Sequence, residues 1–245
     1  MTKTHRIPDS YERTAMIIGA SSGIGAALAC ELSRLGWRLA IAARRLDALE
    51  KIAGACSPGT LVRRLDLTES EKSVAIVETL FQELGTVDLF IISAGTGNIN
   101  PELESSPDKD TLLVNVIGFA CLAQAAMRCF FRQGYGHLVG ITSIAALRGS
   151  GSSTAYSASK AFESVYLDGL RDNAGKRNLP IHVTEVQPGF VDTDMMKTDR
   201  PFWVATPELA ARQIMRAVER RAKHGYITRR WALIAWLLKL LPRPG

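Results

Sequence analysis

The chain has 245 residues, a length that suits one large α/β domain or two small ones. Hydrophobic residues make up 47% and charged residues 22%, as in ordinary folded proteins, and a chain of this length buries a sizeable core without needing disulfides. Its 30 Lys and Arg against 24 Asp and Glu indicate either an anionic partner or a solvated surface with extra cations. We expect no nucleic-acid partner, because the chain has neither a helix-turn-helix pattern nor an aromatic-rich basic strand face.

The four cysteines, Cys30, Cys56, Cys121 and Cys129, form no CxxC pair and belong to no cluster with metal-ligand spacing. We therefore expect no metal site, and the free thiols suggest a reducing compartment. Residues 1–14 are polar and charged without an apolar core, which predicts no secretory signal. Together these features predict a cytoplasmic protein.

Short β-rich runs alternate with helical stretches along the chain, a pattern that predicts βαβ units around a parallel sheet. The predicted strands cover residues 15–18, 38–42, 61–65, 87–92, 137–142, 181–186 and, with the weakest pattern, 226–228. The predicted helices cover 24–35, 46–55, a stretch from Thr68 with a capping box completed by Glu71, 106–131, 155–174 and 206–225. We expect an α/β fold of the doubly wound Rossmann type, with a mostly parallel seven-stranded sheet and helices on both faces.

The domain organisation follows from these elements. Residues 1–13 form an N-terminal tail, residues 14–228 a single catalytic domain, and residues 229–245 an apolar C-terminal segment. Residues 190–205 lack clear periodicity and are long for a plain connection, so they are predicted to be the substrate loop.

A glycine-rich turn, Gly19-Ala20-Ser21-Ser22-Gly23-Ile24-Gly25, follows the first predicted strand and precedes a helix. Glycines at this spacing let backbone N–H groups approach a pyrophosphate, and the helix N-terminus adds a favourable dipole. The alternative is a tight strand–helix turn without a ligand.

The end of the second predicted strand bears on the choice between NAD and NADP. A cofactor with free ribose hydroxyls usually meets an acid there, but this chain has Arg44 and Arg45, with no acid before Asp47. Planar guanidinium groups suit a 2′-phosphate, so the sequence predicts NADP(H) in preference to NAD(H). Asp66, at the end of the third strand, could bind an adenine amino group or could be a plain turn residue.

Tyr156 and Lys160 lie four residues apart in a predicted helix and therefore share one face of it. An ammonium group beside a phenol lowers the phenol pKa from about 10, which makes the tyrosine a workable acid and base nearer neutral pH. Ser143 ends the fifth strand, at the edge where open parallel sheets bind ligands, and could hydrogen-bond a substrate oxygen. Asn115, a polar residue in an apolar helical run, could hold a proton-relay water or be a satisfied core asparagine.

Taken together, these motifs resemble the short-chain dehydrogenase/reductase family, in its shorter single-domain branch. The resemblance covers residues 14–226 and rests on Gly19–Gly25, Asp66, Ala94-Gly95, Asn115, Ser143, Tyr156-xxx-Lys160 and Pro188-Gly189, in this order. The chain departs from the family where it has Ile92-Ser93-Ala94-Gly95, since two asparagines that usually help to hold the sheet and cofactor are missing.

The resemblance implies a mechanism in which Tyr156 is the acid and base, Ser143 polarises the substrate carbonyl, Lys160 binds the nicotinamide ribose and lowers the tyrosine pKa, and Asn115 orders a relay water. The catalytic residues expected from it are Asn115, Ser143, Tyr156 and Lys160. The cofactor-binding residues expected are Gly19, Ser21, Ser22, Gly23, Ile24, Gly25, Arg44, Arg45, Asp66, Leu67, Ala94, Gly95, Asn115, Tyr156, Lys160, Pro188, Gly189, Val191 and Thr193. The chain is then an NADPH-dependent oxidoreductase acting on a small carbonyl or alcohol; the alternative is a catalytically idle NADPH-binding sensor or scaffold protein.

Apolar residues of the substrate loop, including Met195, Met196, Phe202 and Trp203, suggest an apolar substrate wall, or else side chains that pack the loop down. Ten of the eleven residues in 231–241 are apolar, too few to span a membrane, and arginines flank them. This segment is expected to lie on a membrane surface, where a lipid-like substrate becomes plausible, or to contact another subunit in a homodimer or homotetramer.

Overall fold

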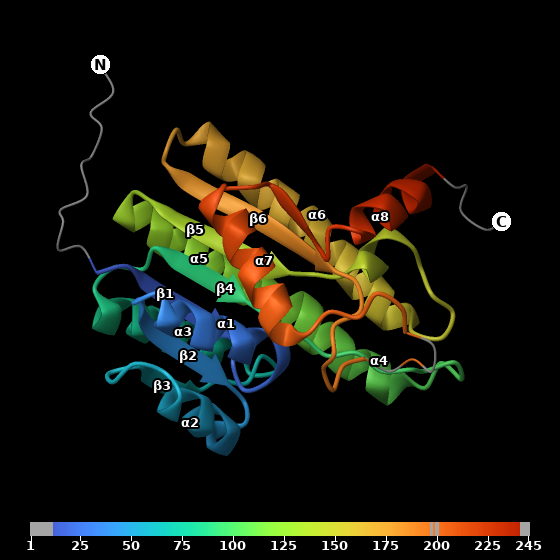
Figure 1. The fold of residues 1–245 in the computed structure, drawn as a ribbon, viewed down its shortest axis with the longest axis horizontal. Coiled ribbons are helices and arrows are strands. Elements are labelled where there is room, and N and C mark those ends of the chain that lie inside the picture. The colour runs from blue at the N-terminus through green and yellow to red at the C-terminus, as the bar shows by residue number, and fades with distance from the viewer. Residues whose placement is uncertain (1–11, 197, 199–200, 241–245) are drawn as a thin grey trace.

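The computed structural model describes residues 12–196, 198 and 201–240 (Figure 1). Within them seven strands form one sheet in the order β3-β2-β1-β4-β5-β6-β7, and all neighbouring strands are parallel. The strands are β1 (Thr14–Ile18), β2 (Arg38–Ala43), β3 (Leu61–Arg64), β4 (Leu89–Ile92), β5 (Gly136–Ile141), β6 (Ile181–Pro188) and β7 (His224–Ile227). The predicted Rossmann-type fold is confirmed, including the weakly patterned seventh strand.

Helices cover both faces of this sheet (Figure 1). They are α1 (Gly23–Arg34), α2 (Leu46–Gly54), α3 (Ser70–Leu84), α4 (Ser105–Leu112), α5 (Phe119–Gln133), α6 (Thr154–Lys176), α7 (Pro207–Glu219) and α8 (Trp231–Leu240), with a π-helix η1 (Leu113–Gly118) and a 3-10 helix η2 (Ile144–Leu147). Most of the strands are buried on both faces, which explains why the central strands are nearly continuous apolar runs.

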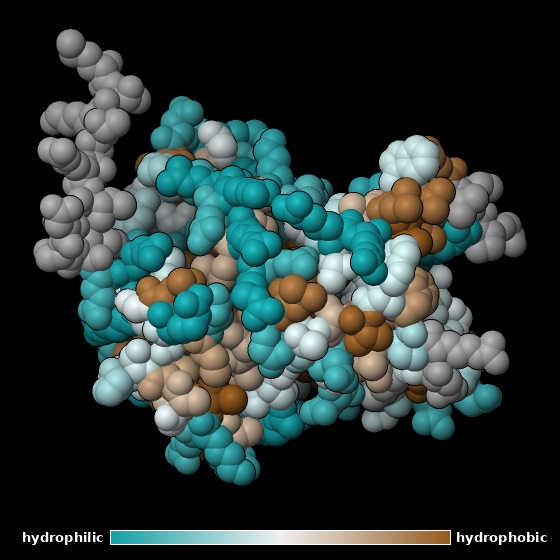
Figure 2. Space-filling view, viewed as in Figure 1, coloured by the Kyte–Doolittle hydropathy of each residue, from teal (hydrophilic) through white to brown (hydrophobic). Residues whose placement is uncertain are grey.

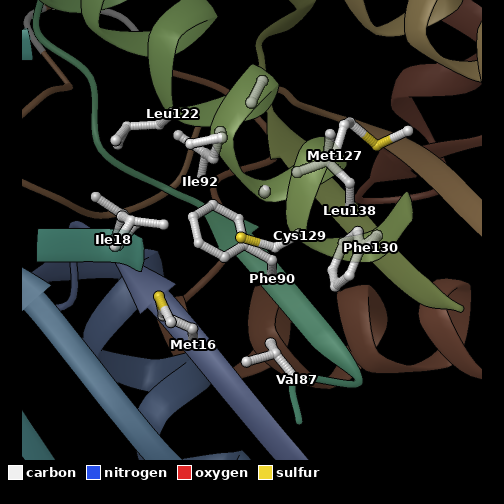
Figure 3. Packing of buried hydrophobic residues seen from close by; sticks show 14 of the residues in the cluster. Met16, Ile18, Val87, Phe90, Ile92, Leu122, Met127, Cys129, Phe130 and Leu138 are labelled. Carbon is white, nitrogen blue, oxygen red and sulfur yellow. The ribbon is translucent and has the colours of Figure 1, made fainter. Parts of the chain in front are cut away.

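Alternate residues of each strand face opposite layers, so the sheet divides two hydrophobic cores. Ile17, Ile41 and Ile91 pack with α1, α2 and α7 on one face. Met16 and Phe90 pack with α3, α5 and α6 on the other, where Figure 3 shows side chains of β1 and β4 meeting those of α5. The two layers hold the strand ends in place, and those ends carry the candidate site.

The helical run 105–133 is long and apolar enough to cross a membrane by length and composition alone. Half of its most apolar stretch is buried, and α5 packs into the core through Phe119, Leu122 and Phe130. Core packing therefore accounts for the apolarity of this run.

Several predicted boundaries need correction. The capping box at Thr68 is wrong: α3 begins at Ser70, no side chain caps it, and the Thr68 hydroxyl instead donates to Asp66 Oδ1 at 2.8 Å. The predicted helix 206–225 ends at Glu219, since the chain must turn to enter β7. Its start is confirmed, because the Leu209 N–H donates to the Thr206 hydroxyl at 3.2 Å.

Candidate active site

The predicted site residues come from the carboxyl ends of successive parallel strands, which meet at one edge of the sheet. Gly19 follows β1, Arg44 follows β2, Ala94 follows β4, Ser143 follows β5 and Gly189 follows β6. Strands β1 and β4 are direct neighbours, so the glycine turn and Ala94 are brought together although 75 residues separate Gly19 from Ala94.

The glycine turn has no room for side chains at its first and last glycines. Gly19 has φ +91°, and a Cβ there would lie 2.4 Å from the Ala94 backbone nitrogen. A Cβ on Gly25 would lie 2.1 Å from the Gly19 carbonyl oxygen. The turn is thus folded tightly against the end of β4. The side chain of Ser22, the N-cap residue of α1, accepts no hydrogen bond from the first turn of the helix, so the N–H groups of that turn remain available for an anion.

Arg45 reaches across this turn. Its Nη2 donates to Ser22 Oγ at 2.7 Å and to Ser21 Oγ at 3.3 Å, so a guanidinium group from the end of β2 lies beside the predicted pyrophosphate-binding backbone. Arg44, its neighbour, is exposed. Asp66 accepts from the Thr68 backbone N–H at 3.1 Å as well as from its hydroxyl, so its carboxylate is held at the end of β3.

The substrate loop folds back over the same turn. A Cβ on Gly23, which has φ +55°, would lie 2.9 Å from Thr193 Cγ2. An isolated bridge joins Val191 to Ala205 and anchors the two ends of the loop to each other. Two predicted cofactor residues far apart in the sequence, Gly23 and Thr193, are therefore in contact.

Tyr156 and Lys160 lie one helical turn apart on α6, as predicted, with Lys160 Nζ 5.9 Å from the centre of the Tyr156 ring. Glycines after β4 make room for both. A Cβ on Gly97 would lie 2.5 Å from the Tyr156 ring, and one on Gly95 would lie 3.1 Å from Lys160 Nζ. The chain after β4 thus passes directly over the Tyr–Lys pair.

Glu163 is a member of the site that the sequence analysis missed. Lys160 Nζ donates to both oxygens of its carboxylate, at 2.8 and 3.0 Å, and to the Ile141 carbonyl oxygen at 3.3 Å. Lys160 is 3% exposed and Glu163 is fully buried. An acid three residues after Lys160 on the same helix face was the signal that could have found it.

Burial shifts both members of this ion pair. Burial lowers the pKa of Lys160, but the charges of Glu163 and Tyr156 outweigh it, and the net pKa is raised. Burial raises the pKa of Glu163 to about 7 against the opposing charge of Lys160, and the nearby Glu185 carboxylate raises it further. Lys160 therefore keeps its charge in a dry environment because Glu163 is beside it.

A second buried carboxylate, Glu185 on β6, lies behind this pair. Its Oε1 accepts from the Thr142 hydroxyl at 2.8 Å and from the Gln187 amide at 2.9 Å, and its Oε2 lies 2.9 Å from His224 Nδ1. Burial acts to raise the pKa of Glu185, but hydrogen bonds, led by that of His224, lower it overall. Glu185 is thus an ionised group that joins β5, β6 and β7 below the site.

Asn115 lies in the π-helix η1 and is fully buried. Its amide donates to the Thr96 carbonyl at 2.7 Å and to Ser159 Oγ at 3.0 Å, and its Oδ1 accepts from the Thr96 N–H at 2.9 Å. The side chain therefore holds the chain after β4 against α6. One lone pair of Oδ1 remains for a further donor such as water.

The remaining predicted residues are placed as follows. Ser143 caps η2, with its Oγ accepting from the Ala145 N–H at 3.1 Å. Leu67 lies against η1, since a Cβ on Gly118 would be 2.7 Å from it. Pro188 ends β6, and Gly189 after it packs against Trp231 of α8 rather than against the glycine turn. Among the described residues, no three His, Cys, Asp or Glu side chains gather as a metal site.

Comparison with known proteins shows the family and the fold of this chain. The model of the short chain dehydrogenase family matches residues 13–202. The chain belongs to the short-chain dehydrogenase family. An uncharacterized oxidoreductase of Myxococcus xanthus is 35% identical to this short-chain dehydrogenase over 202 residues, 79% of each chain.

Solved structures share its fold. A short-chain dehydrogenase from Sphingobium yanoikuyae in complex with NADPH has a TM-score of 0.79 and 23% identity, over 95% of this chain and 98% of that one. A short-chain dehydrogenase/reductase from Burkholderia phymatum in complex with NAD has a TM-score of 0.81 and 20% identity, over 92% of each chain. Family membership makes this short-chain dehydrogenase an oxidoreductase, and the expectation drawn from its motifs is confirmed at that level.

Proposed function

We propose that this protein is an NADPH-dependent reductase of a carbonyl group on an apolar substrate, and that it can oxidise the matching alcohol. The observation that carries the proposal is the placement of Tyr156 and Lys160 on one face of α6, under the chain that follows β4, at the sheet edge where the glycine turn opens. A phenol and an ammonium group so arranged can move a proton at a substrate oxygen.

The residues at this edge fit a dinucleotide. In the glycine turn, a Cβ on Gly19 or Gly25 would fill the space beside the backbone. Helix α1 begins there without a side-chain cap, and Arg45 adds a positive charge beside the turn. Gly19, Gly23, Ser22, Ala94 and Thr193 would hold the phosphates and the nicotinamide end, with Gly95, Asn115 and Lys160 around the ribose. A bound nicotinamide supplies the hydride.

The chain's own residues would manage the proton and the substrate. Tyr156 Oη gives its proton to the carbonyl oxygen during reduction, and Ser143 Oγ orients that oxygen by a hydrogen bond. Lys160, kept charged by Glu163, would hold the nicotinamide ribose and places a positive charge 5.9 Å from the centre of the Tyr156 ring. The remaining lone pair of Asn115 Oδ1 would hold a water through which the proton is replaced.

NADP(H) is proposed as the preferred cofactor. Relatives of this fold have been solved with NADPH and with NAD, so the fold alone does not decide between them. Arg44 and Arg45 follow β2, where an NAD enzyme usually has an acid, and two guanidinium groups suit the additional phosphate.

An apolar substrate fits the side chains of the substrate loop. Phe190, Phe202 and Trp231 form a cluster with ring centres 5.0 to 5.5 Å apart, joining the substrate loop to α8.

We further propose that the protein acts in the cytoplasm as a homodimer or homotetramer. The apolar groove lined by Leu112, Leu113, Val116 and Ile117, on the outer side of α4 and η1, supports a subunit contact.

The test is the oxidation of NADPH, followed by its absorbance, with a panel of aldehydes and ketones of increasing chain length. We expect Tyr156→Phe to lower kcat by about a hundredfold or more while NADPH still binds. Tyr166→Phe, on the same helix and hydrogen-bonded to Gln124, is the matched control and should retain activity. Cofactor binding without turnover of any panel member would instead favour a catalytically idle NADPH sensor or scaffold.

A further inference from the structure

The C-terminal helix α8 exposes apolar side chains where a water-facing helix would carry polar ones. Trp231 and Ala235 fasten it to the protein. Leu233, Trp236, Leu237 and Leu240 form a stripe at i, i+3, i+4 and i+7 that is 42 to 63% exposed. Figure 2 shows brown, hydrophobic side chains gathered over α8 at a corner of the molecule. This stripe is left uncovered in the monomer.

A cationic groove lies next to the base of this helix. It measures about 430 Å³ and is bounded by the substrate loop, α7 and the start of α8. Its walls carry three exposed arginines, Arg216, Arg229 and Arg230, beside apolar surface from Trp203, Val204 and Leu209. Within the described chain, none of the three guanidinium groups has an ion pair or a hydrogen bond.

The same groove also contains polar atoms without a partner. Gln213 Oε1 and Thr228 Oγ1 both line it, and both are buried without a hydrogen bond. A hydroxyl group that is buried and unsatisfied costs free energy until an acceptor arrives. Three guanidinium groups and the Thr228 hydroxyl are therefore donors without acceptors in one groove, beside one acceptor without a donor, Gln213 Oε1.

The charge of this end of the chain is one-sided. From residue 220 to residue 245 the sequence contains no Asp or Glu but seven Lys and Arg: Arg220, Arg221, Lys223, Arg229, Arg230, Lys239 and Arg243. A two-fold contact through α8 and its groove would place Arg216, Arg229 and Arg230 of one copy opposite the same three groups of the other, so cations would oppose cations. An anionic partner fits the patch better than a second copy does.

We propose that α8 and the groove at its base form a docking face for an anionic lipid surface. The stripe from Leu233 to Leu240 enters the boundary between head groups and acyl chains, and Trp236 lies at the interface that tryptophan favours. Arg216, Arg229 and Arg230 bind the phosphate of an anionic head group in the groove. Apolar burial and charge then act on the same face of the protein.

This docking face is continuous with the substrate segments. Helix α8 packs against η2, which follows Ser143, and Trp231 stacks on Phe202 of the substrate loop with ring centres 5.0 Å apart. Resting on the proposed function, the substrate class is then a carbonyl compound that partitions into the membrane. Such a substrate would pass to Tyr156 from the lipid side without crossing water.

The test is sedimentation of the full chain with vesicles of phosphatidylcholine, with and without phosphatidylglycerol, in the absence of cofactor and substrate. We expect binding to the anionic vesicles that weakens with salt, as contacts between cations and lipid phosphates do. Arg229→Gln/Arg230→Gln should weaken it by about fivefold for each arginine removed. Leu233→Gln/Trp236→Gln should weaken it by at least about tenfold.

Matched controls remove the same groups elsewhere. Arg220→Gln/Lys223→Gln takes two charges from the turn before β7, outside the groove, and Leu103→Gln takes an exposed apolar side chain from the segment before α4. Both should bind anionic vesicles within about twofold of the unmodified chain, because surface charge acts locally within a Debye length.

Several results would overturn the proposal. Equal binding to both kinds of vesicle would remove the head-group site, and saturation by inorganic phosphate without vesicles would assign the groove to a soluble anion. Self-association that Trp236→Gln abolishes, without vesicle binding, would assign the stripe to a second copy. Because no turnover is measured, a failure of the proposed reductase activity leaves the vesicle result unaffected.

Discussion

The ion pair between Lys160 and Glu163 is the feature on which the residue-scale chemistry depends. A lone ammonium group at this depth loses its water without compensation and tends to give up its proton. The Glu163 carboxylate forms an ion pair with Lys160 Nζ at 2.8 Å, which replaces the lost interaction with water, so Lys160 stays charged beside Tyr156. Glu163 acts through Lys160 and does not touch the reacting atoms, which makes it a positioning residue.

Glu163→Gln should destabilise the protein by about 3–5 kcal/mol at about pH 8, because it leaves a buried cation without its partner. The loss should shrink towards about pH 10. Without Glu163, burial lowers the pKa of Lys160 in the folded variant below its value in the unfolded chain. As pH rises, Lys160 therefore loses its proton in the folded variant before it does so in the unfolded chain, and the free energy of unfolding of the variant increases. Urea unfolding at the two pH values measures this.

The control for this variant is Asp172→Asn, which breaks an exposed ion pair with Lys176 on the same helix and should change stability by at most about 0.5 kcal/mol. Lys160→Met/Glu163→Gln should be more stable than Glu163→Gln alone, since no charge is left buried. A double variant no more stable than the single one would contradict this account of the pair.

Arg45 should decide the cofactor preference by direct contact with the additional phosphate. Arg45→Ala should raise the KM for NADPH by about tenfold or more, the value of one hydrogen bond to a charged group, and change that for NADH by less than about twofold. Lys51→Ala, which removes an exposed cation from the last turn of α2, is the control and should alter neither. Equal effects on both cofactors would show that Arg45 only supports the glycine turn through Ser22.

At the scale of elements, periodicity and turn residues predicted every strand. Most strands have a run of apolar residues bounded by polar or glycine positions, whereas β3 and β7 contain only two apolar residues each. They could not predict that 106–131 divides into α4, η1 and α5. The division depends on Asn115, whose amide is held by Thr96 and Ser159 from distant parts of the chain. The capping box at Thr68 failed for a similar reason, since Asp66 competes for the Thr68 hydroxyl.

The docking of α8 depends on one glycine. A Cβ on Gly189 would lie 1.9 Å from the Trp231 ring, so Gly189→Ala must displace Trp231 and the helix it begins. We expect a loss of about 1–3 kcal/mol in the free energy of unfolding, as for overpacked cores, and faster proteolysis of α8. Gly169→Ala is the control: it is exposed on α6 with no atom within 4 Å, and it should stabilise the protein by up to about 1 kcal/mol. Unchanged proteolysis of α8 in Gly189→Ala would show that the ring has another place to go.

For the whole molecule, the parallel sheet brings residues from six strand ends to one edge, and this much of the site followed from the predicted topology. The contacts between Gly23 and Thr193 and between Gly189 and Trp231 did not, because they depend on how an aperiodic loop and a terminal helix fold back over that edge. Two buried polar residues were also beyond prediction: His137 and Glu185 lie in strands that pattern alone assigns to an apolar core. Glu163, by contrast, could have been found from its spacing to Lys160.

His137 should make the stability of the whole fold depend on pH in mildly acidic solution. It is buried on β5, directly beside His182 on the neighbouring strand β6, and its Nε2 lies 2.8 Å from the Thr184 hydroxyl. Burial, with the charges of His182 and Arg221, lowers the pKa of His137 to about 3. Between about pH 6.5 and pH 3, His137 binds a proton in the unfolded chain but not in the folded chain. The free energy of unfolding therefore falls as pH falls, by about 1.4 kcal/mol per pH unit.

His137→Gln keeps a hydrogen-bond donor for the Thr184 hydroxyl and removes the group that titrates. Between about pH 6.5 and pH 5, urea unfolding should therefore show a loss about 2 kcal/mol smaller in this variant than in the unmodified chain. His182→Gln, at a half-exposed position, should reduce the loss less, and equal acid sensitivity of all three proteins would mean that His137 is protonated in the folded state.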